Sequence, residues 1–292
     1  MTVRFLLPLT VIAAAWCGNL AADEPATVLV YEIDRPEGAR AGVSKLHVNR
    51  LVSAIGTRLR TGQVKGGRVR ARDDNRIEVT IHSTDPKTVQ RIARLVESPG
   101  TLEFRILANR RDHKPLIERA AKAGGPAVKD EKGKRLAWWV PVTAGAEAAF
   151  DKDKDIATRK RKQGDRESLE VLVVQDQFNV DWRYLKSVSP GVDSRGKPCV
   201  DFTFDARGGK LFGGLTGNNL PDEATGFARK IGIILDGRLD SAPAIRGTIR
   251  QRGVITGRFT KQEVEDLVAV LNAGTLPVRI KRVGKSTVNL KR

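Results

Sequence analysis

The order of hydrophobic patterns between residues 27 and 107 constrains the fold of this chain most strongly. Alternation with a period of two predicts strands, and apolar residues spaced by three and four predict helices. These patterns give strand, helix, two strands joined by a turn, helix and strand, at residues 27–33, 45–60, 68–72, 76–81, 86–97 and 101–107. The order β-α-β-β-α-β is that of a ferredoxin-like lobe, whose helices cover one face of an antiparallel sheet. We therefore predict an α+β base lobe, called the base below, over residues 27–108.

A charged, glycine-bearing stretch at about residues 109–133 is interpreted as a connector, and a second folded region is expected from residue 169. Alternating patterns predict strands at residues 135–142, 169–174, 200–204, 230–235 and 238–241. Asp236 and Gly237 separate the last two strands and are typical of a two-residue hairpin turn. Residues 143–163 are expected to form a helix that runs into a solvated, highly charged segment.

The last helix is marked at both ends. Thr260 followed by Glu263 is a capping box, and Gly274 with Pro277 ends the helix before a final strand at residues 277–283.

The N-terminal segment predicts export from the cytoplasm. Arg4 precedes an apolar run that continues to Trp16, and small residues lead to Asp23, which is the layout of a secretory signal peptide over residues 1–22. The alternative is an uncleaved membrane anchor, because residues 5–22 carry no charge and are just long enough to span a bilayer. Cleavage would remove Cys17 and leave Cys199 without a disulfide partner, so we expect Cys199 to be a buried, unreactive side chain.

No combination of residues predicts catalysis. His47, His82 and His113 lack a second ligand at metal-binding spacing. The segment 284–287 (GKST) lacks the earlier glycine of a phosphate-binding loop, and the aspartates at 151–155 lack the glycine and glutamate of a calcium loop. We therefore predict no catalytic residue, no cofactor and no metal, and hence no enzyme.

The net charge restricts the partners. Lys and Arg number 52 against 34 Asp and Glu, a net charge of +18. Such an excess attracts anionic partners by long-range steering. Nucleic acid is excluded as a partner because the protein is expected outside the cytoplasm and offers few aromatic residues for base stacking. An anionic membrane surface is the better electrostatic partner, and a plain solubility role is the alternative.

Five short segments of the second half, in this order, resemble the first periplasmic domain of SecD, a subunit that assists the bacterial Sec translocon. They are residues 200–205 (VDFTFD), 233–237 (IILDG), 241–243 (SAP), 255–260 (ITGRFT) and 271–277 (LNAGTLP). Residues 74–79 (DNRIEV) and 101–105 (TLEFR) resemble the base of that domain. The resemblance extends over about residues 48–282. It also implies a helix after Asp205, which we expect to be weak or replaced because each glycine inside a helix costs about 0.5–1 kcal/mol relative to alanine. These glycines are Gly208, Gly209, Gly213 and Gly214.

The resemblance implies a two-lobed, non-enzymatic domain whose ferredoxin-like base carries an inserted α+β head lobe. That layout assigns residues 109–168 to the connector and the start of the head, 169–252 to the head, 253–283 to a helix and strand that return to the base, and 284–292 to a basic tail. We interpret the motif residues that form turns and caps as structural. They are Asp236, Gly237, Ser241, Ala242, Pro243, Thr256, Gly257, Gly274 and Pro277.

The resemblance also implies a function in protein export. The leading hypothesis is an extracytoplasmic, periplasmic domain, free or anchored, that holds secretory polypeptide or docks on components of the Sec translocon. The alternative hypothesis is a basic scaffold of the cell envelope or membrane surface that kept this fold but lost the translocation role.

Overall fold

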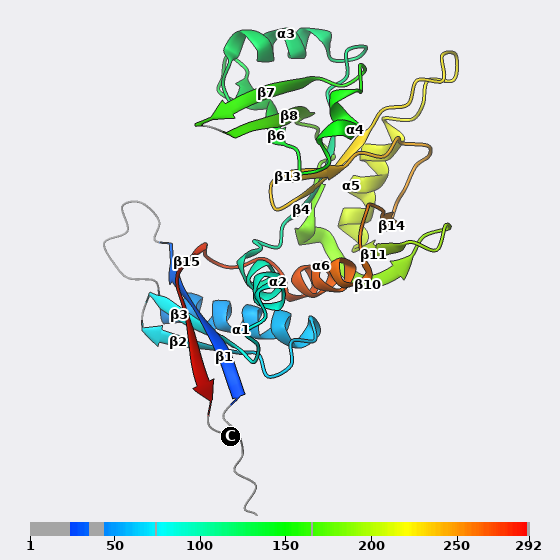
Figure 1. Cartoon of the computed structure of the whole chain (residues 1–292). Coiled ribbons are helices and arrows are strands. Elements are labelled where there is room, and N and C mark those ends of the chain that lie inside the picture. The colour runs from blue at the N-terminus through cyan, green and yellow to red at the C-terminus, as the bar shows by residue number, and fades with distance from the viewer. Residues whose placement is uncertain (1–23, 35–43, 74, 165, 291–292) are drawn as a thin grey trace, which may run out of the picture.

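A computed structural model describes residues 24–34, 44–73, 75–164 and 166–290, so the predicted signal peptide or anchor at residues 1–22 lies outside the described residues. No helix within these ranges is long and apolar enough to span a membrane. The described chain is a mixed α+β structure with four sheets, which confirms the predicted class. Figure 1 shows a lower group around α1 and α2, a middle group around α5 and α6, and an outer lobe around α3.

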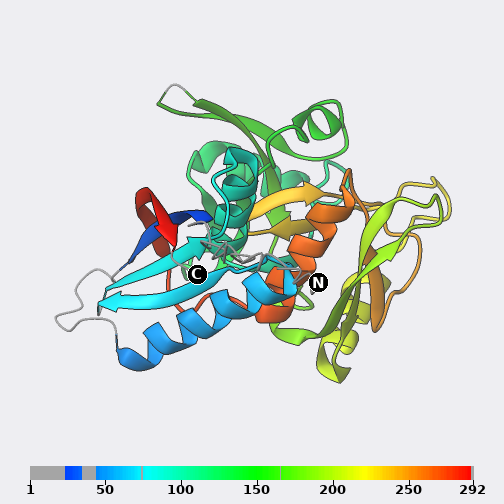
Figure 2. The same ribbon diagram turned by 60° about the horizontal axis from the view of Figure 1, so that its bottom comes forward.

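The lower group is an antiparallel sheet with the strand order β15-β1-β3-β2. Its strands are β1 (Glu24–Ile33), β2 (Arg68–Asp73), β3 (Arg76–Ile81) and β15 (Ile280–Leu290), and its helices are α1 (Lys45–Thr61) and α2 (Pro86–Glu97). Leu29, Tyr31 and Ile77 of the sheet share a buried core with Leu51 and Ile92 of the helices. Figure 2 shows α1 running along the two strands of the β2–β3 hairpin.

The strand predicted to complete this sheet lies elsewhere. β4 (Leu102–Ile106) pairs with β12 (Ile231–Leu235) and β9 (Val180–Asp181) in a second sheet, of order β13-β12-β4-β9. The edge position beside β1 is taken by β15, which pairs along the whole strand from Glu24 opposite Leu290 to Ile33 opposite Ile280. The assignment of residues 101–107 to the base sheet was therefore wrong. Local alternation predicted the strand, but the packing of Phe104 in a different core determines its partners.

The prediction of a basic tail at residues 284–292 was also wrong for residues 284–290, the part that the structure describes. These residues continue β15 and pair with β1. Their polar side chains concealed the strand because β15 is an edge strand, where charged residues are common.

The middle group packs two sheets and two helices around one aromatic core. Its remaining elements are β10 (Leu185–Val192), β11 (Pro198–Phe204), α5 (Ala206–Gly217), β13 (Arg238–Ser241), β14 (Arg252–Ile255) and α6 (Lys261–Ala273). Phe104, Phe202, Phe204 and Phe212 lie with ring centroids 5.0–6.0 Å apart. Edge-to-face contacts of this kind add to the stabilisation from burial alone. Cys199 in β11 is fully buried and free, as predicted.

The outer lobe occupies much of the stretch that was interpreted as a connector. Its elements are α3 (Lys114–Ala123), β5 (Ala127–Lys129), β6 (Arg135–Pro141), α4 (Glu147–Asp151), β7 (Thr158–Gln163) and β8 (Arg166–Val174). The helix expected over residues 143–163 was wrong, because only the short α4 forms before β7 begins. The charges of β7 suit an exposed edge of the sheet β5-β6-β8-β7, and they conceal its strand pattern.

The glycine-rich helix α5 is complete, contrary to the expectation that it would be weak. Asp205 caps it by accepting a hydrogen bond from the N–H of Gly208 at 2.7 Å. The missing side chains allow close packing, since a Cβ on Gly208 would lie 2.5 Å from Cβ of Tyr184 and one on Gly214 would lie 2.5 Å from the ring of Phe178. The contacts of its neighbours therefore compensate for the low helix propensity of α5.

This packing predicts opposite effects for two glycines of the same helix. Gly208→Ala should lower the free energy of unfolding by about 1–3 kcal/mol, because the new methyl group collides with the rigid Cβ atoms of Tyr184 and Phe204. Gly213→Ala should raise it by up to about 1 kcal/mol, because the nearest atom is Cγ of the exposed Arg250, 3.4 Å away. Urea unfolding of both variants measures the difference, and equal effects would contradict this account of α5.

Candidate functional site

The structure separates the nine motif residues into two groups. Asp236, Gly237 and Gly274 lie where the base meets the middle group, and Pro277 follows in the segment that leads to β15. The other residues border a cleft farther out. Ser241, Ala242 and Gly257 line that cleft, while Pro243 and Thr256 are exposed next to them in sequence.

The first group holds the start of β4. Asp236 and Gly237 form the predicted hairpin turn between β12 and β13, with φ angles of 50° and 76°. The carboxylate of Asp236 accepts hydrogen bonds from the N–H of Gly100 at 2.8 Å, from the N–H of Thr101 at 2.9 Å and from the hydroxyl of Ser98. The turn therefore joins the end of α2 to the second sheet.

A buried arginine lies at the same junction. Arg58 of α1 is fully buried and donates hydrogen bonds to the carbonyl oxygens of Ser98 at 2.5 Å and Gly274 at 2.9 Å. These carbonyls follow the C-termini of α2 and α6, where a positive charge is favourable. Burial lowers the pKa of Arg58 to about 10 and the nearby charge of Asp236 opposes this shift, so the guanidinium stays charged at neutral pH. We call Arg58, Asp236 and their acceptors and donors the junction.

The second group lines a cleft of about 550 Å³ between the outer lobe and the N-terminus of α6. One wall comes from α4 and the segment before it, one from the end of β13, and one from the loop between β14 and α6. Phe150 and Phe259 make the walls partly apolar. The cleft is also lined by alanines and by charged residues, which are Ala146, Ala149, Ala242, Asp153, Lys230, Asp240, Arg258 and Glu263.

The charged groups of the cleft differ in how they are compensated. Asp153 forms an ion pair with Lys230, and Glu263 accepts a hydrogen bond from the N–H of Thr260 at 2.8 Å in the predicted capping box. Asp240 has no ion-pair partner among the described residues. Burial raises the pKa of Asp240, the neighbouring Ser241 hydroxyl opposes this rise, and the charge of Glu263 adds to it. An incompletely solvated carboxylate thus faces an apolar cleft.

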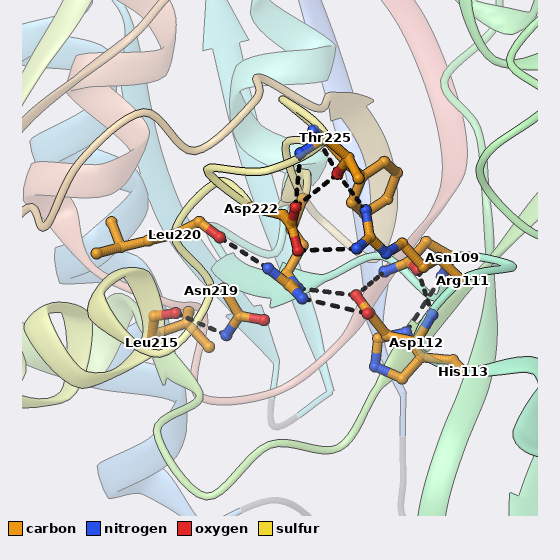
Figure 3. Close-up of polar contacts among 11 residues, drawn as sticks. Asn109, Arg111, Asp112, His113, Leu215, Asn219, Leu220, Asp222 and Thr225 are labelled. Atoms are coloured by element: carbon orange, nitrogen blue, oxygen red, sulfur yellow. Dashed lines mark hydrogen bonds and ion pairs between the residues drawn. The ribbon is translucent and has the colours of Figure 1, made fainter.

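A third polar network fixes the loop after α5 to the beginning of the outer lobe (Figure 3). Arg111 donates to the Asp222 carboxylate at 2.8 Å and to the Thr225 hydroxyl at 2.5 Å. Arg229 donates to the Asp112 carboxylate at 2.8 and 3.1 Å. Sequence reasoning missed this network because its partners are more than a hundred residues apart and no local pattern marks them.

No group of His, Cys, Asp and Glu within the described ranges could hold a metal ion. His47, His82 and His113 lie on three different parts of the fold. The cleft can therefore offer apolar contact, hydrogen bonds and one carboxylate that has no ion-pair partner among the described residues, and these are the means of binding.

Comparisons with known proteins show similarity of this chain to SecD and SecDF. A family model described as "SecDF, P1 head subdomain" matches residues 156–278. The protein translocase subunit SecD of Elusimicrobium minutum is 42% identical over 93 residues, which cover 32% of this chain and 18% of that protein. SecD of Rhodobacter capsulatus is 31% identical over 216 residues, which cover 70% of this chain and 36% of that protein. The matches thus span only about a fifth to a third of these relatives.

Two solved structures share the fold. A crystal structure of SecDF in a super-membrane-facing form matches with a TM-score of 0.57 and 20% identity over 91% of this chain and 30% of that chain. A structure of SecDF, described as a membrane component that enhances protein export, matches with a TM-score of 0.54 and 20% identity over 88% of this chain and 98% of that chain. The chain resembles SecD in both sequence and fold. The similarity to SecD predicted from the motifs is therefore confirmed.

The SecDF head match includes both groups of motif residues. It begins in the outer lobe just before β7 and ends just after α6. The junction and the cleft both draw residues from this part, whereas Arg58 comes from α1, outside it. A structural role for the motif residues shared with SecD remains a prediction.

The junction predicts a large loss of stability on a conservative change. Arg58→Lys should lower the free energy of unfolding by about 1–3 kcal/mol, because one ammonium cannot reach the carbonyl acceptors of both helices and leaves buried acceptors without a partner. Arg60→Lys is the matched control on the same helix, since Arg60 is exposed and its guanidinium donates a hydrogen bond to the nearby Thr57 hydroxyl. Thermal and urea unfolding should separate the two variants, and equal stability would contradict the role of the junction.

The raised pKa of Asp240 predicts a pH-dependent gain in stability. The ionised carboxylate is less favourable in the folded chain than in the unfolded chain, so it destabilises the fold above its raised pKa, and this effect disappears as the pH falls through the usual value of 3.8. Asp240→Asn should therefore raise Tm at pH 7 and leave it unchanged at acidic pH. Asp193→Asn should lower Tm at pH 7, because hydrogen bonds from Lys197 and Arg195 lower the pKa of Asp193. Calorimetry across pH checks both signs.

Proposed function

We propose that this chain is a non-catalytic, extracytoplasmic domain that assists protein export by holding an unfolded segment of secretory polypeptide. It acts either free or anchored to the membrane through residues 1–22. It acts beside components of the translocon, because the relative SecD is named as a protein translocase subunit. The observation that carries the proposal is the cleft at the head, whose lining includes motif residues Ser241, Ala242 and Gly257 and residues of three separate chain segments.

The size and lining of the cleft favour a short unfolded segment. A volume of about 550 Å³ takes a few side chains and is too small for a folded domain. Phe150 and Phe259 supply apolar contact, which an unfolded polypeptide offers and a folded one largely conceals. Because the cleft carries no set of catalytic groups, binding is the activity that its geometry supports.

The remainder of the chain would serve as the support of this cleft. The strand order β15-β1-β3-β2, with α1 and α2 packed on the sheet, supports a ferredoxin-like base made of the two ends of the described chain. The elements between β4 and β14 then form an inserted head. In this arrangement α6 packs Ala269 and Val270 against the base core and Val264 and Leu271 against the head core.

A tryptophan scan of α4 tests the proposal. Ala149→Trp places a bulky ring in the cleft and should weaken binding of an unfolded secretory polypeptide at least tenfold. Ala148→Trp is the matched control, because Ala148 is equally exposed on the same helix but does not line the cleft. Binding of each full-length variant to the unfolded and to the folded form of one secretory protein is measured by fluorescence anisotropy.

The salt dependence of the same assay distinguishes the alternative function. Binding through the apolar cleft should persist at 0.15 M salt, where the Debye length is about 8 Å. An electrostatic scaffold that binds anionic surfaces would instead lose its affinity as salt rises. Equal binding of the folded and unfolded forms, or equal effects of Ala148→Trp and Ala149→Trp, would overturn the proposed holding role.

A further inference from the structure

We infer that the cleft prefers unfolded segments that carry a lysine or arginine among apolar residues, and that Asp240 receives the cation. This inference rests on the proposed function, since it names the class of polypeptide that the same cleft selects. It follows from the placement of Asp240, from the engagement of its charged neighbours, and from the contrast between the cleft and the rest of the surface.

Asp240 is positioned by the strand that carries it. It lies in β13 directly after Leu239, which is fully buried, and before Ser241, which pairs with Ile233 of the neighbouring strand. Because Leu239 pairs with Ile234, Asp240 is the extra, unpaired residue of a β-bulge. A bulge changes the direction of a side chain relative to the sheet, and Asp240 lines the cleft.

The other charged groups of the cleft leave Asp240 available. Lys230 is paired with Asp153, and Glu263 is occupied by the backbone and hydroxyl of Thr260 in the capping box. Arg258 also lines the cleft, but it is exposed and forms no ion pair with a described residue. A ligand cation therefore competes only with the solvated Arg258 for the carboxylate of Asp240.

The apolar walls decide which cations fit. Burying a carboxylate without a partner is unfavourable, and an opposite charge removes that cost. A lysine side chain places four methylene groups against the apolar surface before its ammonium reaches a polar partner. Phe150 and Phe259 provide such a surface in the same cleft as Asp240. The match is to a cation on an apolar stem and not to a small inorganic ion.

The charge of the whole chain makes this preference diagnostic. A protein of net charge +18 repels cationic peptides and attracts anionic ones at long range. A preference for lysine over an uncharged or acidic residue is therefore opposite to the effect of the overall charge, and it must arise locally in the cleft.

The test uses three unfolded peptides that differ at one central position, which holds lysine, norleucine or glutamate in the same apolar sequence. The full chain should bind the lysine peptide about tenfold more tightly than the norleucine peptide at 0.15 M salt, and the glutamate peptide most weakly. Asp240→Asn should reduce the preference for lysine to less than about twofold. Glu223→Gln, which removes an exposed negative charge outside the cleft, is the matched control and should keep the preference.

The outcomes separate this inference from the proposed function. Equal binding of the lysine and norleucine peptides, or a lysine preference that survives in Asp240→Asn, overturns the inference and leaves the holding role in place. No binding of any peptide overturns the holding role itself. Thermal unfolding of Asp240→Asn, which should be at least as stable as the parent chain, confirms that any loss of preference does not come from misfolding.

Discussion

The structure depends on one buried cation. Arg58 is fully buried, and a charge in that position is tolerated because carbonyl oxygens at the C-terminal ends of two helices accept hydrogen bonds from it. Its guanidinium reaches carbonyls after the C-termini of α2 and α6, and Asp236 lies close enough to favour the charged form. Arg58 therefore lies at the place where the C-terminal ends of α2 and α6, the start of β4 and the β12–β13 turn meet. The cleft is held in place through this junction, since β13 and α6 both lead from it into the cleft walls.

Much of the local structure could be predicted from the sequence because local contacts determine it. The capping box of Thr260 and Glu263 and the Asp236-Gly237 turn both form as expected. The partners of β4 and β15 could not be predicted, because their sheets are chosen by the packing of residues far apart in sequence. The charged edge strand β7 was misread because exposure leaves it without an alternating apolar pattern.

The candidate site was predicted only in part. The resemblance to SecD directed attention to Ser241, Ala242 and Gly257, which line the cleft, but also to Asp236 and Gly274, which belong to the junction. Nothing in the motifs distinguishes the two groups. Asp240 was missed although it lies between the motif residues Gly237 and Ser241. A single aspartate in a strand does not indicate a binding role until its burial is known.

The pairing of the first described strand with the last has a consequence for the order of events during synthesis. β1 lies between β3 and β15, so one of its edges stays unpaired until residues 280–290 have been made. The contacts between β1 and β15 join residues more than two hundred positions apart, which makes them slow to form. The elements between β1 and β15 can fold before this sheet is complete, and the nascent chain exposes an unprotected strand edge until residues 280–290 pair with β1.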